Sequence, residues 1–182
     1  MSRCVKFVDS SCIESGKMPA VLFLVCGKIA SGKPTLAGSL AAGRNAVLFS
    51  EDDWLSRLYP GEISSIEDYA RYTARLRNAL TPHICALLLS GVSVVLDFPA
   101  NTLNSRKWAR SLFEEAGAAH ELHFLDVPDE ICRARLRARN AEGMHPFAPS
   151  EAEYEEITRH FMPPVEAEGF DIFRHGASGC IK

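Results

Sequence analysis

The sequence predicts an α/β fold in which helices cover a parallel β-sheet. Short apolar runs alternate with longer amphipathic runs, and a glycine-rich loop separates the first run of each kind. This alternation is typical of βαβ units. The composition, with 47% hydrophobic and 24% charged residues, is that of a globular chain, and a length of 182 residues suits one domain.

The predicted strands are short apolar runs at residues 21–26, 46–49, 92–96, 120–127 and 170–174. The predicted helices have apolar residues at helical spacing and span residues 33–42, 66–90, 105–116, 129–140 and 150–161. Pro82 interrupts the longest helical segment. Because proline lacks an N–H donor and clashes with the preceding turn, we expect two helices that meet near Thr81.

We expect one domain over residues 18–182, preceded by a flexible extension over residues 1–17. The extension lacks the apolar core and the cleavage site of a signal peptide. The longest apolar runs are far shorter than the ~20 residues that a membrane span needs. No two of the six cysteines form a CxxC pair, and Cys26 and Cys85 lie in apolar segments. These features predict buried thiols in a reducing, cytoplasmic compartment.

The loop after the first predicted strand matches the pattern GxxxxGK. In such a loop, backbone N–H groups wrap a polyphosphate, the lysine reaches the outer phosphates, and the next helix points its positive end at the anion. Glycine permits the turns and the close approach that this needs. The predicted phosphate-binding residues are Gly27, Lys28, Ile29, Ala30, Ser31, Gly32, Lys33, Pro34 and Thr35.

Pro34 stands where the full motif has serine or threonine. The usual hydroxyl binds Mg²⁺ and the usual N–H contacts phosphate, but proline has neither group. Thr35 offers a hydroxyl one residue later, about 100° further round the helix. The sequence therefore puts the metal hydroxyl, and with it the catalytic strength, in question at Pro34.

Acidic residues follow the second and third predicted strands. The second strand runs into Asp52 and Asp53, at the edge of the sheet where α/β proteins bind ligands. Either aspartate could take the proton of an acceptor hydroxyl or hold metal-bound water. The alternative is that they cap a helix over residues 54–58. The third strand runs into Asp97, which resembles the second nucleotide-binding motif of P-loop proteins.

Four arginines alternate along the predicted helix over residues 129–140. Helical spacing places Arg133 and Arg137 on one side and Arg135 and Arg139 on another, nearer the apolar residues. We expect the second pair to contact phosphate and the first pair to form a solvated basic face.

Together, the segments GKIASGKPT, SEDDW, VVLDFPANTLNSRKW and RARLRARN resemble those of small bacterial P-loop kinases. The chain is most similar to the group of AAA-type ATP-binding proteins that includes zeta toxins, chloramphenicol phosphotransferases and polynucleotide kinases, over about residues 18–175. The resemblance implies a three-layer P-loop NTPase fold whose five-stranded parallel sheet has the order 2-3-1-4-5 and whose lid carries arginines. It also implies ATP and Mg²⁺ as cofactors.

The resemblance further implies a role for particular residues. Lys33 would bind the phosphates, Asp52 would act as the base, and Arg135 and Arg139 would be the lid arginines. We expect substrate contacts from Asp53, Asp97, Asn101 and Arg106, and metal contacts from Thr35 and Asp97.

The predicted function is transfer of the γ-phosphate of ATP to a hydroxyl of a small metabolite or antibiotic. One alternative is a polynucleotide 5′-hydroxyl kinase, and another is a degenerate nucleotide-binding protein that transfers weakly because of Pro34. A net charge of -3 and the absence of an aromatic and basic strand surface favour a small acceptor over nucleic acid. The pattern leaves the oligomeric state open.

Overall fold

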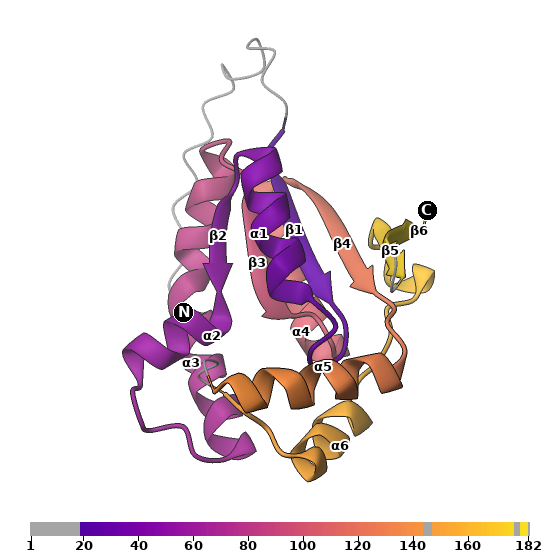
Figure 1. Cartoon of the computed structure of the whole chain (residues 1–182). Coiled ribbons are helices and arrows are strands. Elements are labelled where there is room, and N and C mark those ends of the chain that lie inside the picture. The colour runs from indigo at the N-terminus through magenta and orange to yellow at the C-terminus, as the bar shows by residue number, and fades with distance from the viewer. Residues whose placement is uncertain (1–18, 144–146, 177–178, 182) are drawn as a thin grey trace, which may run out of the picture.

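The computed structural model describes residues 19–143, 147–176 and 179–181, so the proposed extension over residues 1–17 lies outside the described residues. Helices flank a six-stranded sheet with the order β2-β3-β1-β4-β5-β6 (Figure 1). The strands are β1 Val21–Cys26, β2 Val47–Ser50, β3 Val94–Pro99, β4 Ala119–Leu125, β5 Ile172–Gly176 and β6 Gly179–Ile181.

The first five strands are parallel and follow the order 2-3-1-4-5, which confirms the predicted sheet. The sixth strand was not predicted, and it pairs antiparallel with β5. Gly176 and Gly179 stand opposite each other where the chain reverses. A three-residue strand is too short to show a periodic pattern in the sequence, so its formation depends on the edge of β5.

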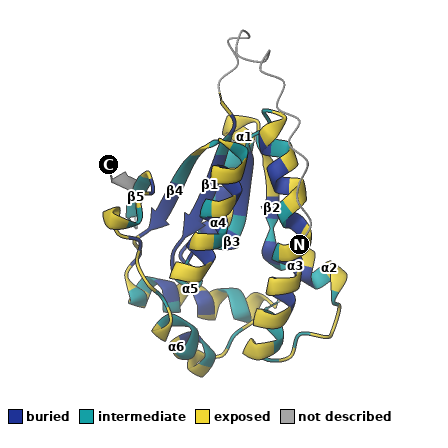
Figure 2. Ribbon diagram, turned by 180° about the vertical axis from the view of Figure 1, so that it is seen from behind, coloured by how far each residue is buried: buried dark blue, intermediate teal, exposed yellow. Residues whose placement is uncertain are grey.

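Helices cover both faces of the sheet, and two more cross its carboxyl edge (Figures 1 and 2). Leu22 and Leu24 of β1 belong to the large core with α3 and α4, whereas Phe23 and Val25 pack with α1. Because both faces of β1 are buried, its sequence is a continuous apolar run rather than an alternating one. The helices are α1 Lys33–Arg44, α2 Glu51–Leu58, α3 Ile66–Leu89, α4 Leu103–Ala116, α5 Asp129–Glu142 and α6 Glu151–Arg159, with a short 3₁₀ turn at Glu166–Glu168.

The expected break at Pro82 is wrong, because α3 is one helix of 24 residues with the proline inside it. Leu80 and Ile84 on either side of the proline are buried in the same core. The hydroxyl of Thr81 donates to a carbonyl of the preceding turn and accepts from Trp108 Nε1 of α4 at 3.0 Å. Packing of the whole apolar face therefore outweighs the backbone hydrogen bond that proline removes.

Arg106 lies inside the protein, where it joins α4 to the segment after α6. Its guanidinium makes two bonds to the Glu168 carboxylate, of 2.6 and 2.9 Å, and two to the carbonyls of Ala100 and Met162, of 2.9 and 2.8 Å. Its exposed fraction is only 1%. These bonds occupy a guanidinium that solvent barely reaches, so Arg106 has a structural role and is not part of the acceptor site considered below.

The apolar thiols behave as predicted. Cys26 and Cys85 are buried, and burial raises the pKa of Cys26 to about 12. Such thiols are inert core groups. Among the described residues, no helix is both long and apolar enough to cross a bilayer.

Candidate nucleotide and acceptor site

The glycine-rich loop joins β1 to α1, in the strand–loop–helix arrangement that the sequence predicts. Gly27 has a φ of +154°, and a Cβ there would lie 2.7 Å from Ser31 Oγ and 3.0 Å from the Leu125 carbonyl oxygen. Gly32 caps α1 with a φ of +107°. The first glycine is thus required by close packing and the second by backbone conformation.

Ser31 carries a buried hydroxyl within this loop. The residue is 3% exposed, and its Oγ finds no hydrogen-bond partner among the described residues. Its backbone N–H donates to the Lys28 carbonyl at 3.2 Å. A buried hydroxyl without a partner is unfavourable, and a phosphate oxygen held in the loop would supply an acceptor. The loop is therefore suited to a phosphate group.

Lys33, at the start of α1, is 9% exposed and folds back over the loop. Its Nζ donates to the carbonyls of Gly27 and Lys28 at 2.8 Å each. Burial lowers the pKa of Lys33, and the charges of Asp97 and Asp52 oppose that shift. The ammonium group therefore lies within electrostatic range of both aspartates.

Asn101, just beyond β3, supports the loop from the neighbouring strand. Its Oδ1 accepts from the Gly27 N–H and its Nδ2 donates to the Gly27 carbonyl, each at 2.9 Å. The sequence predicts an acceptor contact for Asn101, but the structure places its amide on the phosphate loop. We therefore treat Asn101 as a residue that holds the loop in shape.

The acidic segment after β2 begins a helix rather than capping one. The N-cap of α2 is Ser50, so the alternative that Asp52 or Asp53 is the cap is wrong. Asp53 is exposed and pairs with Arg57 at 2.9 Å on the outside of the helix. Asp52 instead accepts from the Tyr69 hydroxyl at 2.8 Å. The two aspartates therefore face different surroundings, and only Asp52 turns toward the site.

Asp97 lies in β3 and is the register partner of Ser50 in β2. The Ser50 hydroxyl donates to its Oδ2 at 3.5 Å, which is a long contact. Burial raises the pKa of Asp97 to about 6, with the Lys33 charge opposing the shift and the Asp52 charge adding to it. Lys33, Asp52 and Asp97 thus form one interacting set at the carboxyl edge of the sheet.

Three residues of this edge are given no role of their own by the sequence. Glu51 is 1% exposed, Tyr69 OH lies 2.9 Å from its Oε1, and Arg77 Nη2 donates to its Oε2 at 3.1 Å. Tyr69 and Arg77 are eight residues apart on α3, a spacing that places them on one face. That spacing was a usable signal, although it does not show that α3 packs against the acidic segment.

The two predicted lid arginines are both in α5, but they lie near different parts of the site. Arg135 Nη1 donates to the Ser31 carbonyl at 3.1 Å, which places it at the phosphate loop. Arg139 donates to the Phe147 carbonyl at 3.3 Å, and its charge interacts with that of Asp52. Arg135 therefore lies at the phosphate loop, and Arg139 lies toward the acidic segment.

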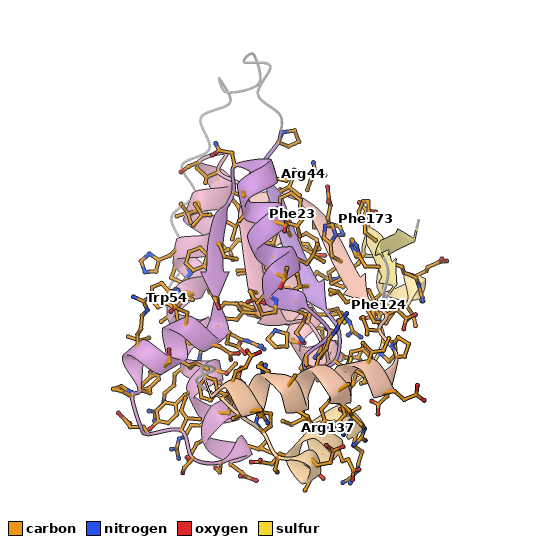
Figure 3. The ribbon with its side chains drawn as sticks, viewed as in Figure 1. Phe23, Arg44, Trp54, Phe124, Arg137 and Phe173 are labelled. Carbon is orange, nitrogen blue, oxygen red and sulfur yellow. The ribbon has the colours of Figure 1, made fainter. Side chains whose placement is uncertain are left out.

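The other two arginines of α5 face α6. Arg137 is exposed and projects from α5, as expected for a solvated face (Figure 3). For Arg133 that expectation is wrong, because its guanidinium pairs with Asp129 at 2.7 Å and also with Glu151 of α6. Asp129 in turn pairs with Lys28 of the phosphate loop at 3.2 Å. This network links the loop, α5 and α6.

The carboxylate and hydroxyl groups of the site can be compared with what a divalent cation needs. Among the described residues, no group of three or more His, Cys, Asp or Glu side chains is arranged to hold a metal ion. Mg²⁺ commonly uses only one or two carboxylates, together with water and substrate phosphates. Asp97 beside Lys33 fits such a role, and the exposed Thr35 is the nearest loop hydroxyl in sequence to Pro34. The residues thus fit a Mg²⁺ ion that is held jointly with a nucleotide.

Comparison with solved structures gives the same fold. A protein from Chloroflexus aurantiacus J-10-fl, provisionally described as a kinase, is 24% identical with a TM-score of 0.73, over 90% of this chain and 88% of that one. Kti12 from Chaetomium thermophilum, solved with ADP-AlF3, is 20% identical with a TM-score of 0.61, over 85% and 88% of the two chains. A sugar kinase from Janibacter sp. HTCC2649 is 16% identical with a TM-score of 0.60, over 88% and 87%.

Sequence comparison identifies the family. No curated protein matches the chain. An AAA domain matches residues 22–164, which include the phosphate loop, the acidic segment and the arginines of α5. The predicted resemblance to AAA-type, kinase-like P-loop proteins is therefore confirmed, and the chain belongs to the AAA domain family.

Proposed function

We propose that this protein is an ATP-dependent phosphotransferase that moves the γ-phosphate of ATP to a hydroxyl of a small molecule. The observation that carries the proposal is the electrostatic coupling of Lys33, at the phosphate loop, to Asp52 and Asp97. A phosphate-binding cation and a proton-accepting carboxylate then belong to one site, as transfer to a hydroxyl requires.

In the proposed reaction, the acceptor oxygen attacks the γ-phosphorus in line with the bond to ADP. Asp52 takes the proton of the acceptor hydroxyl, the new O–P bond forms, and the bond to ADP breaks. Lys33 and Arg135 offset the negative charge on the phosphates. Little covalent chemistry is asked of the protein, because positioning and charge stabilisation supply most of the catalysis.

Asp97 and Thr35 are the residues that would hold Mg²⁺ in this proposal. When bound, the ion would neutralise charge on the phosphates. The neighbouring protein groups have roles of their own: Asn101 keeps Gly27 in place, and Lys33 remains close to both aspartates.

The charge of the acceptor side supports a small acceptor. Glu51, Asp52 and Asp97 bring three carboxyl groups to this edge of the sheet. A nucleic acid would bring its own phosphates close to these groups at an energetic cost. A 5′-hydroxyl oligonucleotide is therefore the less favoured acceptor, and the experiment below includes it.

The test uses ATP labelled at the γ-phosphate and a panel of sugars, nucleosides, aminoglycosides, chloramphenicol and a 5′-hydroxyl oligonucleotide. We expect label to pass to a small compound and the transfer to be abolished by Lys33→Ala or Asp52→Asn. Both variants should remain folded, as a cooperative thermal unfolding transition would show. Full transfer in either variant would remove the assigned roles, and label on the oligonucleotide alone would favour the polynucleotide kinase.

A second candidate function is favoured by Pro34, which is exposed at the first turn of α1. Without the hydroxyl and the N–H, the protein would bind nucleotide and transfer weakly. Pro34→Ser separates the two cases when turnover and ATP affinity are both measured. A large gain in turnover at unchanged affinity identifies a weakened catalyst, whereas equal turnover shows that the proline is compatible with full activity.

A further inference from the structure

One tyrosine hydroxyl bridges two of the three carboxyl groups of the acidic segment, those of Glu51 and Asp52. Tyr69 OH lies 2.9 Å from Glu51 Oε1 and 2.8 Å from Asp52 Oδ1. Arg77 Nη2 holds the other oxygen of Glu51 at 3.1 Å. The Tyr69 ring packs edge-on against Phe147, with centroids 5.4 Å apart. The hydroxyl is therefore fixed between α2 and α3 by contacts on both of its sides.

The number of hydrogens that Glu51, Tyr69 and Asp52 share limits how these three side chains can be bonded. A tyrosine hydroxyl donates a single hydrogen, so it satisfies only one of two ionised carboxylates. The second contact, at hydrogen-bond distance, requires a hydrogen that belongs to a carboxyl group. Burial raises the pKa of Glu51, while the Arg77 charge and the Tyr69 hydrogen bond oppose that shift. The observed distances therefore correspond to a state in which the pair of carboxyl groups holds one proton.

We propose that Glu51 and Tyr69 are positioning residues for Asp52, and that the chain Glu51–Tyr69–Asp52 as a whole accepts the proton released by the acceptor hydroxyl. This inference rests on the proposed function, because it takes Asp52 as the base. Its basis is the geometry of the two hydrogen bonds to Tyr69 and of the contact between Glu51 and Arg77.

Glu51, Tyr69 and Asp52 together account for the proton that the acceptor releases. In the reactive state both carboxylates are ionised and the Tyr69 hydrogen points to one of them. The acceptor O–H bond breaks as the O–P bond forms, and its proton goes to Asp52. Asp52 then donates to the Tyr69 oxygen while the Tyr69 hydrogen turns to Glu51, whose charge Arg77 offsets. The proton returns to solvent after the products leave. Among the described residues, the charged or titratable groups that interact with these three side chains include Lys33 of α1, Asp97 of β3, Arg77 of α3 and Arg139 of α5.

The first test measures phosphate release from MgATP, with water as the acceptor, across a range of pH. Tyr69→Phe keeps the ring and removes the hydroxyl, so we expect kcat to fall about 10- to 100-fold while the KM for ATP stays unchanged. Glu51→Gln removes a negative charge beside Asp52, so the acid limb of the rate profile should move to lower pH. The double variant should be no slower than Tyr69→Phe alone, because both changes interrupt one chain.

Tyr72→Phe is the matched control, because Tyr72 is a buried tyrosine of the same helix whose hydroxyl donates to Glu62 at 2.7 Å. It should leave kcat and the pH profile unchanged. If Tyr69→Phe behaves like Tyr72→Phe, or if the two site substitutions are additive, the inference is wrong although the proposed function stands. If Asp52→Asn hydrolyses MgATP as fast as the wild type, Asp52 is not the general base and the proposed function itself is contradicted.

The second test needs no turnover. Infrared spectra at pH 6 are compared in an Asp97→Asn background, so that the Asp97 carboxyl group does not contribute. Ordinary carboxyl groups are ionised at this pH. We expect a protonated carboxyl band that disappears when Glu51→Gln is added and persists with Tyr72→Phe. Identical spectra with and without Glu51→Gln would overturn the shared proton.

Discussion

At the scale of single residues, the ionised carboxylate of Asp97 lowers the stability of the folded protein at the pH where its proposed role requires the charge. Its pKa in the folded protein is about 6, above the ordinary value of 3.8, because the carboxyl group is buried. The folded state then binds the proton more tightly than the unfolded chain, so the free energy of unfolding falls as pH rises from about 4 to 6 and stays lower above that range. The carboxylate is thus held ionised at neutral pH at a cost in stability.

Asp97→Asn should therefore raise the free energy of unfolding by about 1 kcal/mol at pH 7.5, and the gain should vanish below about pH 4. The value is discounted because Lys33 loses a neighbouring charge in the same variant. Urea denaturation at several pH values measures the effect. Asp53→Asn, at an exposed surface pair, is the control and should show no such dependence on pH. A gain independent of pH would contradict the assignment to this carboxyl group.

Asn101 provides a second prediction at this scale. Asn101→Ala leaves the Gly27 N–H and carbonyl without their side-chain partners, so the free energy of unfolding should fall by about 1–2 kcal/mol. ATP binding should weaken as well, because the loop loses a support. Isothermal calorimetry and urea denaturation measure the two effects, and Asn104→Ala, at an exposed position of α4, is the control. Unchanged ATP affinity would show that the loop keeps its shape unaided.

Single residues with a motif of their own could be predicted from the sequence, and residues that act through a neighbour could not. Lys33 is identified by its loop and Asp52 by its place after a strand. The roles of Tyr69 and Glu51 depend on how α3 packs against α2, a contact between segments that are not adjacent in sequence. Asn101 was assigned to the acceptor because the sequence cannot show that its amide reaches back to Gly27.

At the scale of helices and strands, α3 is stable in spite of its proline. Pro82 is exposed and leaves one backbone carbonyl without its helical donor. Pro82→Ala should restore that bond and raise the free energy of unfolding by about 1–2 kcal/mol, because proline also limits the unfolded chain and so offsets part of the gain. Urea denaturation is again the measurement. A less stable variant would mean that the proline ring itself packs favourably at this position.

The junction of the phosphate loop with α5 and α6 is a second feature at this scale. Asp129 accepts from Arg133, Lys28 and the Tyr154 hydroxyl, and the Arg133 bond is the main reason that its pKa falls to about 2. A lowered pKa contributes stability above the ordinary value of 3.8, and this contribution is lost only as pH falls toward 2. The junction should therefore remain intact in mildly acidic solution.

Asp129→Ala should loosen α6 without unfolding the sheet, because Tyr154 and Arg133 lose a shared partner. Hydrogen exchange of the amides should become faster in α6 and stay unchanged in β1. Asp126→Ala, at an exposed position that pairs with Arg174 instead, is the control. Equal exchange in α6 of the variant and the wild type would show that the ion pairs do not hold this helix.

Local patterns explain which of these elements could be predicted. Helices were recognised because burial of one face imposes a helical period on the sequence, and strands because burial of a parallel sheet on both faces gives short apolar runs. The continuity of α3 was missed because a local rule for proline was applied to a helix that packs along its whole length. The start of α2 at Glu51 was missed for another reason. Its first turn carries three acids, and Leu55 is its one buried apolar residue, so the segment has no apolar period to recognise.

At the scale of the whole molecule, the order of the strands came from the family resemblance. Leu22 pairs with Val94 on one side and with His120 on the other, and no local pattern joins such distant positions. The right-handed crossovers of parallel strands narrow the choices without selecting one. Once the phosphate loop indicates the family, the order follows, and the carboxyl ends of β1, β2 and β3 then bring Lys33, Asp52 and Asp97 together.

A chain that begins at Met18 tests the domain boundary. If residues 1–17 are an extension, the shortened protein should keep the thermal unfolding midpoint and the ATP affinity of the full chain, because the described core begins with Ala20. Differential scanning calorimetry and a nucleotide titration measure the two quantities. Failure of the shortened chain to fold would make the first residues part of the domain.

The bonds of Arg106 have a consequence for the other end of the chain. A truncation that removed Glu168 would strip the carboxylate from a guanidinium that is only 1% exposed, and an uncompensated cation would remain beneath the end of β3. The segment after α6 is therefore needed for the fold, because it supplies the carboxylate that neutralises this buried charge.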